Sequence, residues 1–348
     1  LKITLIIFFM SLIESQKRLF KNPKQMKKKN FLILLLPTLL LAASACCDKP
    51  KYANRAEKLS ALMHDPNSDY VMVASHRGDW RGFPENSIPA FESAIRMGVD
   101  IVEMDVRMTR DSQLVIMHDL TVTRTTDFKP GKEPGCESPY IKDLTLAQLK
   151  GLRLLRAQGI ATDSLRIPTL AEALICCKDK ALVNLDGGTW YLRQVMPVIE
   201  SLGMTEQVIL KDGVSVERMN RRIDRYDKFP MYMPICSGTN LKQIGEYIEN
   251  GINDATKKPV AFELCFGPDN TASDYVPGAS LVRESGARVW MNTIGSGWCG
   301  RGNDDDAAVI ASDPGEIYGP VIEAGINIIQ TDRPALLLDY LRSVGKHD

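Results

Sequence analysis

Strand-like and helix-like segments alternate between residues 70 and 341, and this alternation narrows the fold more than any other property of the sequence. The strand-like segments are apolar runs that contain β-branched residues and are bounded by Gly, Pro or Asp. Eight such runs are present: Tyr70–Ser75, Val99–Asp105, Ala181–Asp186, Gln207–Lys211, Met231–Ile235, Pro259–Leu264, Arg288–Asn292 and Asn327–Thr331. Amphipathic patterns typical of helices accompany them: Ile88–Met97, Leu192–Leu202, Val216–Tyr226, Leu241–Asn250, Ala279–Glu284, Ala307–Glu323 and Ala335–Leu341. About eight strands with intervening helices predict a (β/α)8 TIM barrel, although a doubly wound α/β sheet shows a similar alternation.

The connection between the second and third predicted barrel strands is too long for a single helix. A strand-like run, Gln113–His118, precedes it, and the connection contains a Gly- and Pro-rich stretch, Lys129–Gly135. Two short helical patterns follow, near Leu146–Leu152 and Leu170–Cys177. We therefore predict a single-domain barrel over residues 69–348, with an insertion of about residues 119–167 over its mouth.

The first 68 residues are predicted to stand outside the barrel. From Met26, three lysines precede an apolar run, Phe31–Leu41, and the small residues before Cys46 resemble a lipoprotein cleavage site. Residues 26–45 are expected to be a lipoprotein signal peptide, residues 1–25 an upstream extension and residues 46–68 a linker; an ordinary secretory signal is the alternative. A transmembrane helix needs about 20 apolar residues, and this run is shorter. We expect an exported protein of the bacterial cell envelope, held at the membrane by lipid on Cys46.

The charge balance changes when that segment is set aside. The whole chain has 43 Lys and Arg against 43 Asp and Glu. Residues 1–45 hold eight of the basic residues and one of the acidic ones, so the rest carries 35 basic and 42 acidic residues, a net charge of −7. Neither balance indicates nucleic-acid binding, and an acidic protein that binds an anion needs a local cation in its site.

Polar side chains gather where the predicted strands end, and the carboxyl ends of barrel strands are where TIM barrels carry their chemistry. The residues at or beside these ends are His76, Arg77, Glu103, Asp105, His118, Asp119, Asp186, Lys211, Glu263, Trp290, Asn292 and Asp332. Packing alone does not explain this distribution, because such groups are costly to bury without partners. We therefore expect one functional site at this end of the barrel.

Two pairs among these residues indicate particular chemistry. Glu103 and Asp105 are two positions apart on a strand, so their carboxylates face the same side, and their mutual repulsion favours a bound cation. Oxygen ligands suit Ca²⁺ or Mg²⁺, although the histidines also leave zinc open. His76 and His118 each end an apolar run, and two such imidazoles can serve as general acid and general base near neutral pH. Elsewhere, the aspartates at 304–306 indicate a charged helix N-terminus more simply than a second cation site.

A set of ordered motifs resembles the glycerophosphodiester phosphodiesterase family. The segment His76–Thr126 contains HRG, then PEN with AF and G-x-D, then E-x-D, then HD followed by RTT. The segments Ile167–Leu174, Val289–Thr293 and Gln330–Leu341 are similar to downstream parts of the same family. The resemblance spans about residues 70–341, and it implies a TIM barrel with an insertion after the second strand.

The resemblance also implies roles for the site residues. His76 and His118 match the family's acid–base pair, and Arg77 matches its phosphate-binding arginine. Glu103 and Asp105 match two ligands of one divalent cation, Ca²⁺ or Mg²⁺.

The third carboxylate departs from the family's pattern. Relatives read N-I-E-I-K where this chain reads Asn184-Leu185-Asp186-Gly187-Gly188. Asp186 thus stands for the glutamate that binds the cation, and Gly188 stands for a lysine of the phosphate pocket. Lys211, at the end of the next strand, is the candidate to replace that positive charge, and its alternative is a solvated loop lysine.

Two further residues are candidate substrate contacts. Glu85, in the PEN segment, either touches the substrate or shapes the turn that it occupies. Trp290 either packs under the substrate or is an ordinary core tryptophan.

The activity that the resemblance implies is metal-dependent hydrolysis of glycerophosphodiesters to sn-glycerol 3-phosphate and an alcohol by His/His acid–base catalysis. A phospholipase-type phosphodiesterase, directed at phosphatidylinositol, lysophospholipid or sphingomyelin and releasing in some cases a cyclic phosphate, is the first alternative. A non-catalytic surface lipoprotein that binds phosphorylated ligands is the second. The expected partner is a small-molecule phosphodiester, and the sequence does not indicate an oligomeric state.

Overall fold

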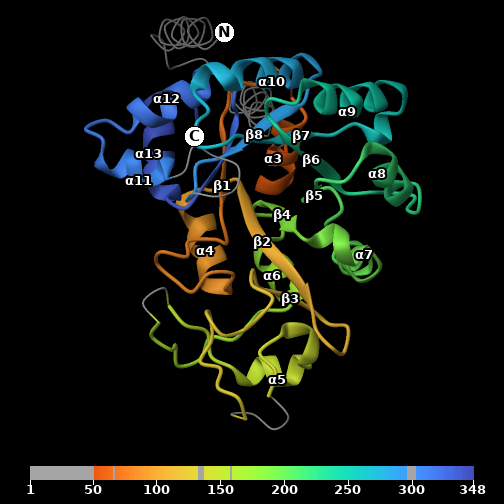
Figure 1. The fold of residues 1–348 in the computed structure, drawn as a ribbon, viewed down its shortest axis with the longest axis vertical. Helices are drawn as coiled ribbons and strands as arrows, with labels where there is room; N and C mark the ends of the chain where they lie inside the picture. Colours follow the sequence, from red (N-terminus) through yellow and green to blue (C-terminus); the bar gives the residue numbers. More distant parts are fainter. Residues whose placement is uncertain (1–50, 66, 132–136, 157–158, 296–302) are drawn as a thin grey trace, which may run out of the picture. The chain divides into compact units, whose positions relative to one another are not determined.

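The computed structural model describes residues 51–65, 67–131, 137–156, 159–295 and 303–348 (Figure 1). The chain divides into two units, residues 1–53 and 54–348, and the fold described here is that of the second. The predicted signal peptide, residues 26–45, and Cys46 lie outside the described residues.

Eight parallel strands in the described part of the chain close into a barrel, which confirms the (β/α)8 fold. Around the barrel they are β1 (Met72–Ser75), β2 (Ile101–Met108), β4 (Leu182–Asp186), β5 (Val208–Asp212), β6 (Met231–Ser237), β7 (Ala261–Cys265), β8 (Arg288–Asn292) and β9 (Ile328–Thr331). Strand β1 closes the ring because it pairs with both β9 and β2, with Ala74 opposite Gln330 on one side and Ile101 on the other. Each strand overlaps one of the eight predicted from the sequence.

Helices follow the strands and cover the outside of the barrel. They are α4 (Ile88–Met97), α6 (Leu170–Cys177), α7 (Leu192–Ser201), α8 (Val216–Ile223), α9 (Leu241–Asn253), α10 (Ala272–Glu284), α11 (Asp304–Ile310), α12 (Gly315–Glu323) and α13 (Pro334–Ser343). Their ends follow ordinary capping rules: Ser87 caps α4 through the Ala90 amide, and Gly98 ends it with a positive φ of 102°. None of the helices among the described residues is both long enough and apolar enough to cross a membrane.

The inside of the barrel is a separate core that an additional helix closes. Leu59 and Met63 of helix α3 (Arg55–Met63) pack with barrel residues Met72, Ala74, Ile101, Leu182, Ile209, Met231, Met233, Ala261, Trp290 and Ile328. The buried Arg288 side chain donates to the carbonyls of Leu62 and Tyr70, which holds the end of α3 in place.

Helix α3 corrects the prediction of a linker over residues 46–68. The stretch is polar on average, but Ala56, Leu59 and Met63 form an apolar stripe at helical spacing, and all three are buried. Asn54 caps the helix by accepting a hydrogen bond from the Glu57 amide at 2.8 Å.

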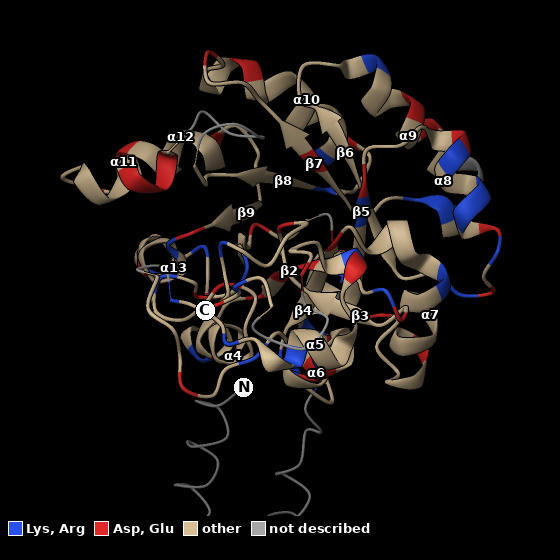
Figure 2. Ribbon diagram, turned by 60° about the horizontal axis from the view of Figure 1, so that its bottom comes forward, with Lys and Arg blue, Asp and Glu red and all other residues tan. Residues whose placement is uncertain are grey.

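The helix predicted over Ala307–Glu323 is also wrong, because two helices occupy this stretch. The backbone turns extended at Ala311, which ends α11, and α12 begins only after Pro314. The residue before a proline is disfavoured in helical conformation, and the Asp313 carboxylate accepts a hydrogen bond from the Gly315 amide at 2.8 Å. The first turn of α11 carries the three aspartates, red in Figure 2.

The segment between β2 and β4 has a hydrophobic core of its own. Strand β3 (Leu114–Ile116) pairs antiparallel with β2, and the 3-10 turn η1 (Ile141–Asp143) and helix α5 (Leu146–Gly151) follow, yellow to yellow-green in Figure 1. The core consists of Val115, Met117, Val122, Ile141, Leu144, Leu149, Leu152, Leu154 and Ile167. This segment therefore packs as a separate layer, and His118 lies in it, two residues after the end of β3.

Candidate active site

A cavity of about 880 Å³ opens at the carboxyl ends of the barrel strands. Its lining brings together residues from nearly the whole length of the described barrel: His76, Arg77, Trp80, Glu85, Glu103, Asp105, Arg107, His118, Arg124, Asp186, Trp190, Lys211, Gly213, Ile235, Glu263, Asn292, Ile294, Gly295, Gln330 and Asp332. Every residue that the sequence analysis expected at the site lies in this lining except Asp119 and Trp290.

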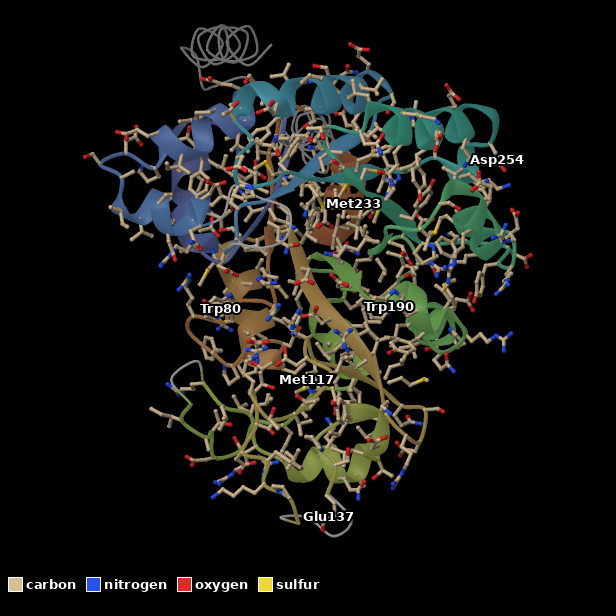
Figure 3. The ribbon with its side chains drawn as sticks, in the orientation of Figure 1. Trp80, Met117, Glu137, Trp190, Met233 and Asp254 are labelled. Atoms are coloured by element: carbon tan, nitrogen blue, oxygen red, sulfur yellow. The ribbon has the colours of Figure 1, made fainter. Side chains whose placement is uncertain are left out.

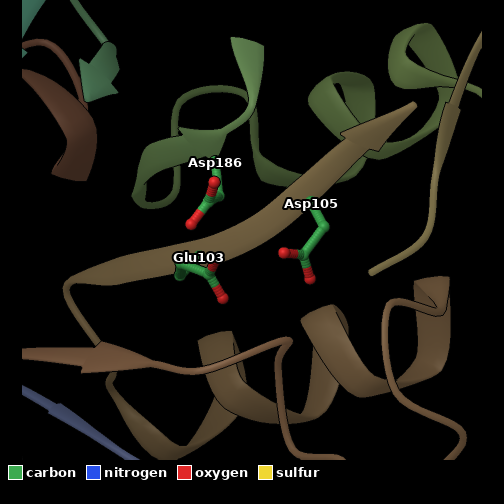
Figure 4. A group of neighbouring side chains, drawn as sticks. All are labelled: Glu103, Asp105 and Asp186. Atoms are coloured by element: carbon green, nitrogen blue, oxygen red, sulfur yellow. The ribbon is translucent and has the colours of Figure 1, made fainter. Parts of the chain in front are cut away.

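Three carboxylates converge on one side of the cavity. Glu103 and Asp105 project from the same face of β2, and Asp186 faces them from β4 (Figure 4). One oxygen of each lies within 4.8 Å of the other two. Glu103 and Asp105 are buried, and burial, followed by repulsion from Asp105, raises the pKa of Glu103 to about 7.

Neighbouring groups hold these carboxylates but do not neutralise all of them. The Arg77 amide donates to Glu103 Oε2 at 2.9 Å, and the Asn86 side chain donates to Asp105 Oδ2 at 2.8 Å. In the whole cavity lining, six carboxylates, those of Glu85, Glu103, Asp105, Asp186, Glu263 and Asp332, face four permanent cations, Arg77, Arg107, Arg124 and Lys211. One divalent cation would balance this charge, and an all-oxygen donor set of this kind fits Ca²⁺ or Mg²⁺.

His76 stands at the end of β1 and is oriented by an aspartate from the end of β9. Its Nδ1 lies 2.7 Å from Asp332 Oδ1, which also accepts a hydrogen bond from Trp80 Nε1 at 2.7 Å. Burial alone would lower the pKa of His76, but the hydrogen bond to Asp332 and the charge of Glu103 outweigh it, so the pKa is raised. Because Nδ1 is held by the carboxylate, Nε2 is the nitrogen left for proton exchange.

Asp305 supports this arrangement from the first turn of α11. The buried carboxylate accepts hydrogen bonds from Thr293 Oγ1 at 2.8 Å, Tyr318 OH at 2.9 Å, Thr331 Oγ1 at 2.9 Å and the Asp332 amide at 2.7 Å. Its oxygens are thus engaged by protein donors, which agrees with the structural explanation of the aspartate run. Asp305 fixes the backbone that carries Asp332, the partner of His76.

His118 has a similar aspartate partner in a more open setting. Its Nδ1 lies 2.7 Å from Asp119 Oδ1. Arg124 donates to Asp119 at 2.7 and 2.9 Å and to both oxygens of Glu85 at 2.6 and 2.8 Å. The hydrogen bonds from Arg124 lower the pKa of Asp119 to about 2.

Glu85 lies in the cavity, but its oxygens bridge two arginines. Besides Arg124, it accepts a hydrogen bond from Arg77 Nη1 at 3.1 Å. Glu85 therefore positions Arg77 and Arg124. Of the two roles considered for it, shaping the loop fits this geometry better than contacting the substrate.

The loop after β1 packs closely against helix α4. Arg77 has a φ of 55° and Gly78 a φ of 76°. A Cβ at residue 78 would stand 2.8 Å from the carbonyl carbon of Ala90 on α4, so the HRG motif needs its glycine to let this loop lie against the helix.

Lys211 lies at the site, in the place where the sequence analysis sought a replacement cation. Its buried ammonium is 3.1 Å from Asp186 Oδ2 and 3.3 Å from Glu263 Oε2. At residue 188 a Cβ would be 3.0 Å from both Leu185 Cβ and Leu210 Cδ2, which leaves little room for a side chain there. The positive charge therefore comes from β5.

Of the two alternatives for Trp290, the structure fits the core tryptophan. The side chain is completely buried inside the barrel, below the cavity. Strand alternation places residues 290 and 292 on the same face, and only Asn292 reaches the lining. Trp290 Nε1 donates to Asn292 Oδ1 at 2.8 Å, and Asn292 Nδ2 donates to Glu263 Oε1 at 2.9 Å.

The lining residues that the sequence analysis missed include Trp80, Arg107, Trp190 and Gln330. A guanidinium covers each indole ring, Arg81 at 4.6 Å from the Trp80 centroid and Arg107 at 5.5 Å from that of Trp190. Figure 3 labels both tryptophans. Each follows a predicted site residue by four positions, but only the folded loops, including the 3-10 turn η2 (Gly188–Tyr191), bring them to the cavity.

Comparison with known proteins agrees with this geometry. Residues 76–188 match the model of the glycerophosphoryl diester phosphodiesterase family. This segment belongs to that family. Residues 232–341 match a different model, described as a domain of unknown function, so the glycerophosphodiester phosphodiesterase match covers only the first part of the barrel.

Individual relatives match about a third of the chain. A glycerophosphodiester phosphodiesterase of Caldanaerobacter subterraneus is 40% identical over 117 residues, which are 33% of this chain and 44% of the relative. A putative one of Bacillus subtilis is 39% identical over 104 residues, 30% of this chain and 39% of the relative. The chain thus matches less than half the length of these two relatives.

Solved structures extend the likeness in fold to most of the chain. A glycerophosphoryl diester phosphodiesterase from Parabacteroides distasonis superposes with a TM-score of 0.65 at 22% identity, over 83% of this chain and 92% of that one. A phosphodiesterase from Oleispira antarctica, in complex with the product sn-glycerol-3-phosphate, gives a TM-score of 0.57 at 17% identity, over 79% and 97%.

Proposed function

We propose that this protein hydrolyses glycerophosphodiesters to sn-glycerol 3-phosphate and an alcohol. The observation that carries the proposal is the arrangement of two aspartate-bound histidines, His76 and His118, around a cavity that also holds an arginine and three converging carboxylates. The names of the sequence relatives and the product complex of the Oleispira antarctica protein support this choice of reaction.

One divalent cation, Ca²⁺ or Mg²⁺, completes the proposed site. Glu103, Asp105 and Asp186 would hold it, and when bound it supplies a Lewis acid for a phosphate oxygen. Two observations support the proposal. Glu103 and Asp105 are buried, and the cavity lining holds more carboxylates than permanent cations.

The remaining steps fall to protein groups. Arg77 and Lys211 bind the phosphate and offset the negative charge that develops on it. One imidazole removes the proton from the attacking hydroxyl or water, and the other protonates the departing alcohol oxygen. Both act through Nε2, because Asp332 and Asp119 hold the two Nδ1 atoms.

Single replacements of the two histidines test this account. The purified protein with Ca²⁺ or Mg²⁺ should release sn-glycerol 3-phosphate from glycerophosphocholine or a similar diester. His76→Ala and His118→Ala should each lower kcat by about 10²-fold or more, the usual contribution of a general acid or base. Unchanged activity in either variant would contradict the mechanism. Activity confined to lysophospholipid or inositol lipid would favour the phospholipase-type alternative, and ligand binding without turnover would favour a non-catalytic lipoprotein.

We further propose that the protein is exported and anchored by lipid on Cys46. The signal-like sequence before Cys46 motivates this proposal, and the disulfide-bonded state of Cys265 agrees with an oxidising compartment. Replacement Cys46→Ala should move the protein from the membrane fraction to the soluble fraction of the envelope. Membrane association that survives this change would contradict the anchor.

A further inference from the structure

One wall of the cavity is built by strands β7, β8 and β9 and has no part in the proposed chemistry. Glu263, Asn292 and Gln330 extend from these strands into the lining, with Asn292 paired to Gln330 in the strand register. All three lie in residues 232–341, the part of the chain outside the glycerophosphodiester phosphodiesterase match. This wall is therefore where the chain can differ from that family in what it recognises.

The Gln330 amide is the unusual feature of this wall. The residue is only 2% exposed, and its Oε1 is buried without a hydrogen-bond partner among the described residues. Buried amides are costly to leave unpaired, and most native ones have partners. Its neighbour Asn292 shows the ordinary case, since its oxygen accepts from Trp290 and its nitrogen donates to Glu263. The unused hydrogen-bonding capacity of the Gln330 side chain therefore indicates a ligand.

Glu263 offers a second acceptor beside it. Asn292 donates to Oε1, whereas Oε2 accepts no hydrogen bond from the described residues and lies 3.3 Å from the Lys211 ammonium. An amide that both donates and accepts, next to a carboxylate oxygen that accepts, matches neighbouring hydroxyl groups, because each hydroxyl is at once donor and acceptor.

Once the proposed divalent cation balances the lining, no excess negative charge is left to attract a cationic alcohol. Glu85 is paired with two arginines, Asp186 and Glu263 with Lys211, and Asp332 with His76. Both cavity tryptophans already have a guanidinium over the ring, so a quaternary ammonium there would meet like charge. A neutral, hydroxyl-rich group meets neither obstacle.

We propose that the β7–β9 wall binds the hydroxyl groups of the substrate's second alcohol, and that this alcohol is a polyol such as a cyclitol or a sugar. The inference rests on the proposed glycerophosphodiester hydrolysis and specifies its substrate class. A cavity of about 880 Å³ lies within the roughly 300–1,000 Å³ of small-molecule sites, so it has room for a ring beyond the glycerophosphate.

The replacement Gln330→Leu tests the proposal with two substrates, sn-glycero-3-phosphoinositol and sn-glycero-3-phosphocholine. The wild-type protein should have the higher kcat/KM for the inositol diester. The variant should lose about tenfold in kcat/KM for that substrate, the worth of one or two hydrogen bonds, and change little for the choline diester. Gln194→Leu on α7, outside the cavity lining, is the matched control and should change neither value.

Other outcomes overturn the proposal. An equal loss of kcat/KM for both substrates would mean that Gln330 contacts the glycerol that they share. No loss for either substrate would mean that the wall does not bind the second alcohol. A wild-type preference for the choline diester would contradict the polyol assignment. If Gln330→Leu does not fold, as judged by circular dichroism, Gln330→Met takes its place.

Binding measurements test the polyol preference independently of the proposed hydrolysis. In the His118→Ala variant, calorimetry should show tighter binding of sn-glycero-3-phosphoinositol than of the choline diester, and Gln330→Leu should remove the difference. If the wild type cleaves neither diester but the binding preference holds, only the proposed function fails. If both diesters are cleaved without any binding preference, only the polyol assignment fails.

Discussion

The two imidazoles of the cavity differ in burial although each is bound by an aspartate through Nδ1. The His76 side chain is 15% exposed, whereas that of His118 is 45% exposed. The pKa of His76 is raised, because the Asp332 hydrogen bond and the Glu103 charge outweigh its burial. Asp332 therefore does more than orient the ring, since it also keeps the ring protonated to higher pH.

Replacement Asp332→Asn should lower the pKa of His76, because an amide retains the hydrogen-bonding shape without the negative charge. NMR titration of the His76 ring signals in the two proteins measures this. With its pKa raised in the folded state, protonated His76 stabilises the wild type fully below the unfolded pKa, and this stabilisation is lost as pH rises through the folded pKa. An unchanged His76 titration in the variant would show that Asp332 does not set the charge state.

Lys211 is the residue whose loss should harm both activity and stability. Replacement Lys211→Met leaves Asp186 and the buried Glu263 without their shared cation, and it removes a charge from the proposed phosphate site. We expect kcat to fall by about 10²-fold and the melting temperature to drop. Lys242→Met, at an exposed position of α9, is the control. A Lys211→Met protein with normal kcat would exclude Lys211 from the phosphate site.

The positions of site residues could be predicted from the sequence where strand geometry alone determines them. The ends of adjacent parallel strands meet, so Lys211 could be placed beside Asp186 without a structure. The choice between the two alternatives for Trp290 could not be made from the sequence, because alternation gives the direction of a side chain but not its depth in the barrel. Trp80 and Trp190 depend on loop conformations that no periodic pattern encodes.

Among the secondary-structure elements, α11 links a helix terminus to the proposed catalytic site. Asp305 in its first turn has a pKa raised to about 6 by burial, above the usual value of about 3.9. A carboxyl whose folded pKa is raised makes the protein less stable as pH rises from about 4 to about 6.

Replacement Asp305→Asn should remove this contribution. The difference in free energy of unfolding between wild type and variant should therefore change by up to about 3 kcal/mol across that pH range, as measured by urea denaturation. The variant should also have a lower kcat with little change in KM, because the Asp332 amide loses its acceptor. Replacement of the exposed Asp313 by Asn is the control, and a pH-independent difference would contradict this role.

Helix α3 is predicted to matter for stability and not for chemistry. Leu59 is buried inside the closed end of the barrel, so Leu59→Ala should cost about 2–5 kcal/mol. The same change at the exposed Leu241 should cost little. Thermal unfolding compares the two variants, and equal melting temperatures would show that α3 does not seal the barrel core. The sequence analysis missed this helix because the surrounding residues are polar.

On the scale of the whole molecule, fold and specificity are encoded differently. The barrel follows from eight apolar runs, and the motifs proposed to carry the chemistry lie in residues 76–188, which match the phosphodiesterase family. The opposite wall lies in residues 232–341, which match a model without a described function. Its key residue, Gln330, stands in a buried strand and has no distinguishing pattern, so only the structure shows its unpaired amide.

The central claim concerns the reaction, and phosphorus NMR of a glycerophosphodiester incubated with the purified protein tests it most directly. With Ca²⁺ or Mg²⁺ present, the diester resonance should be replaced by that of sn-glycerol 3-phosphate, and chelation or the replacement Glu103→Gln should stop the conversion. A diester resonance that persists with either cation, or conversion that is unaffected by chelation, would contradict the account.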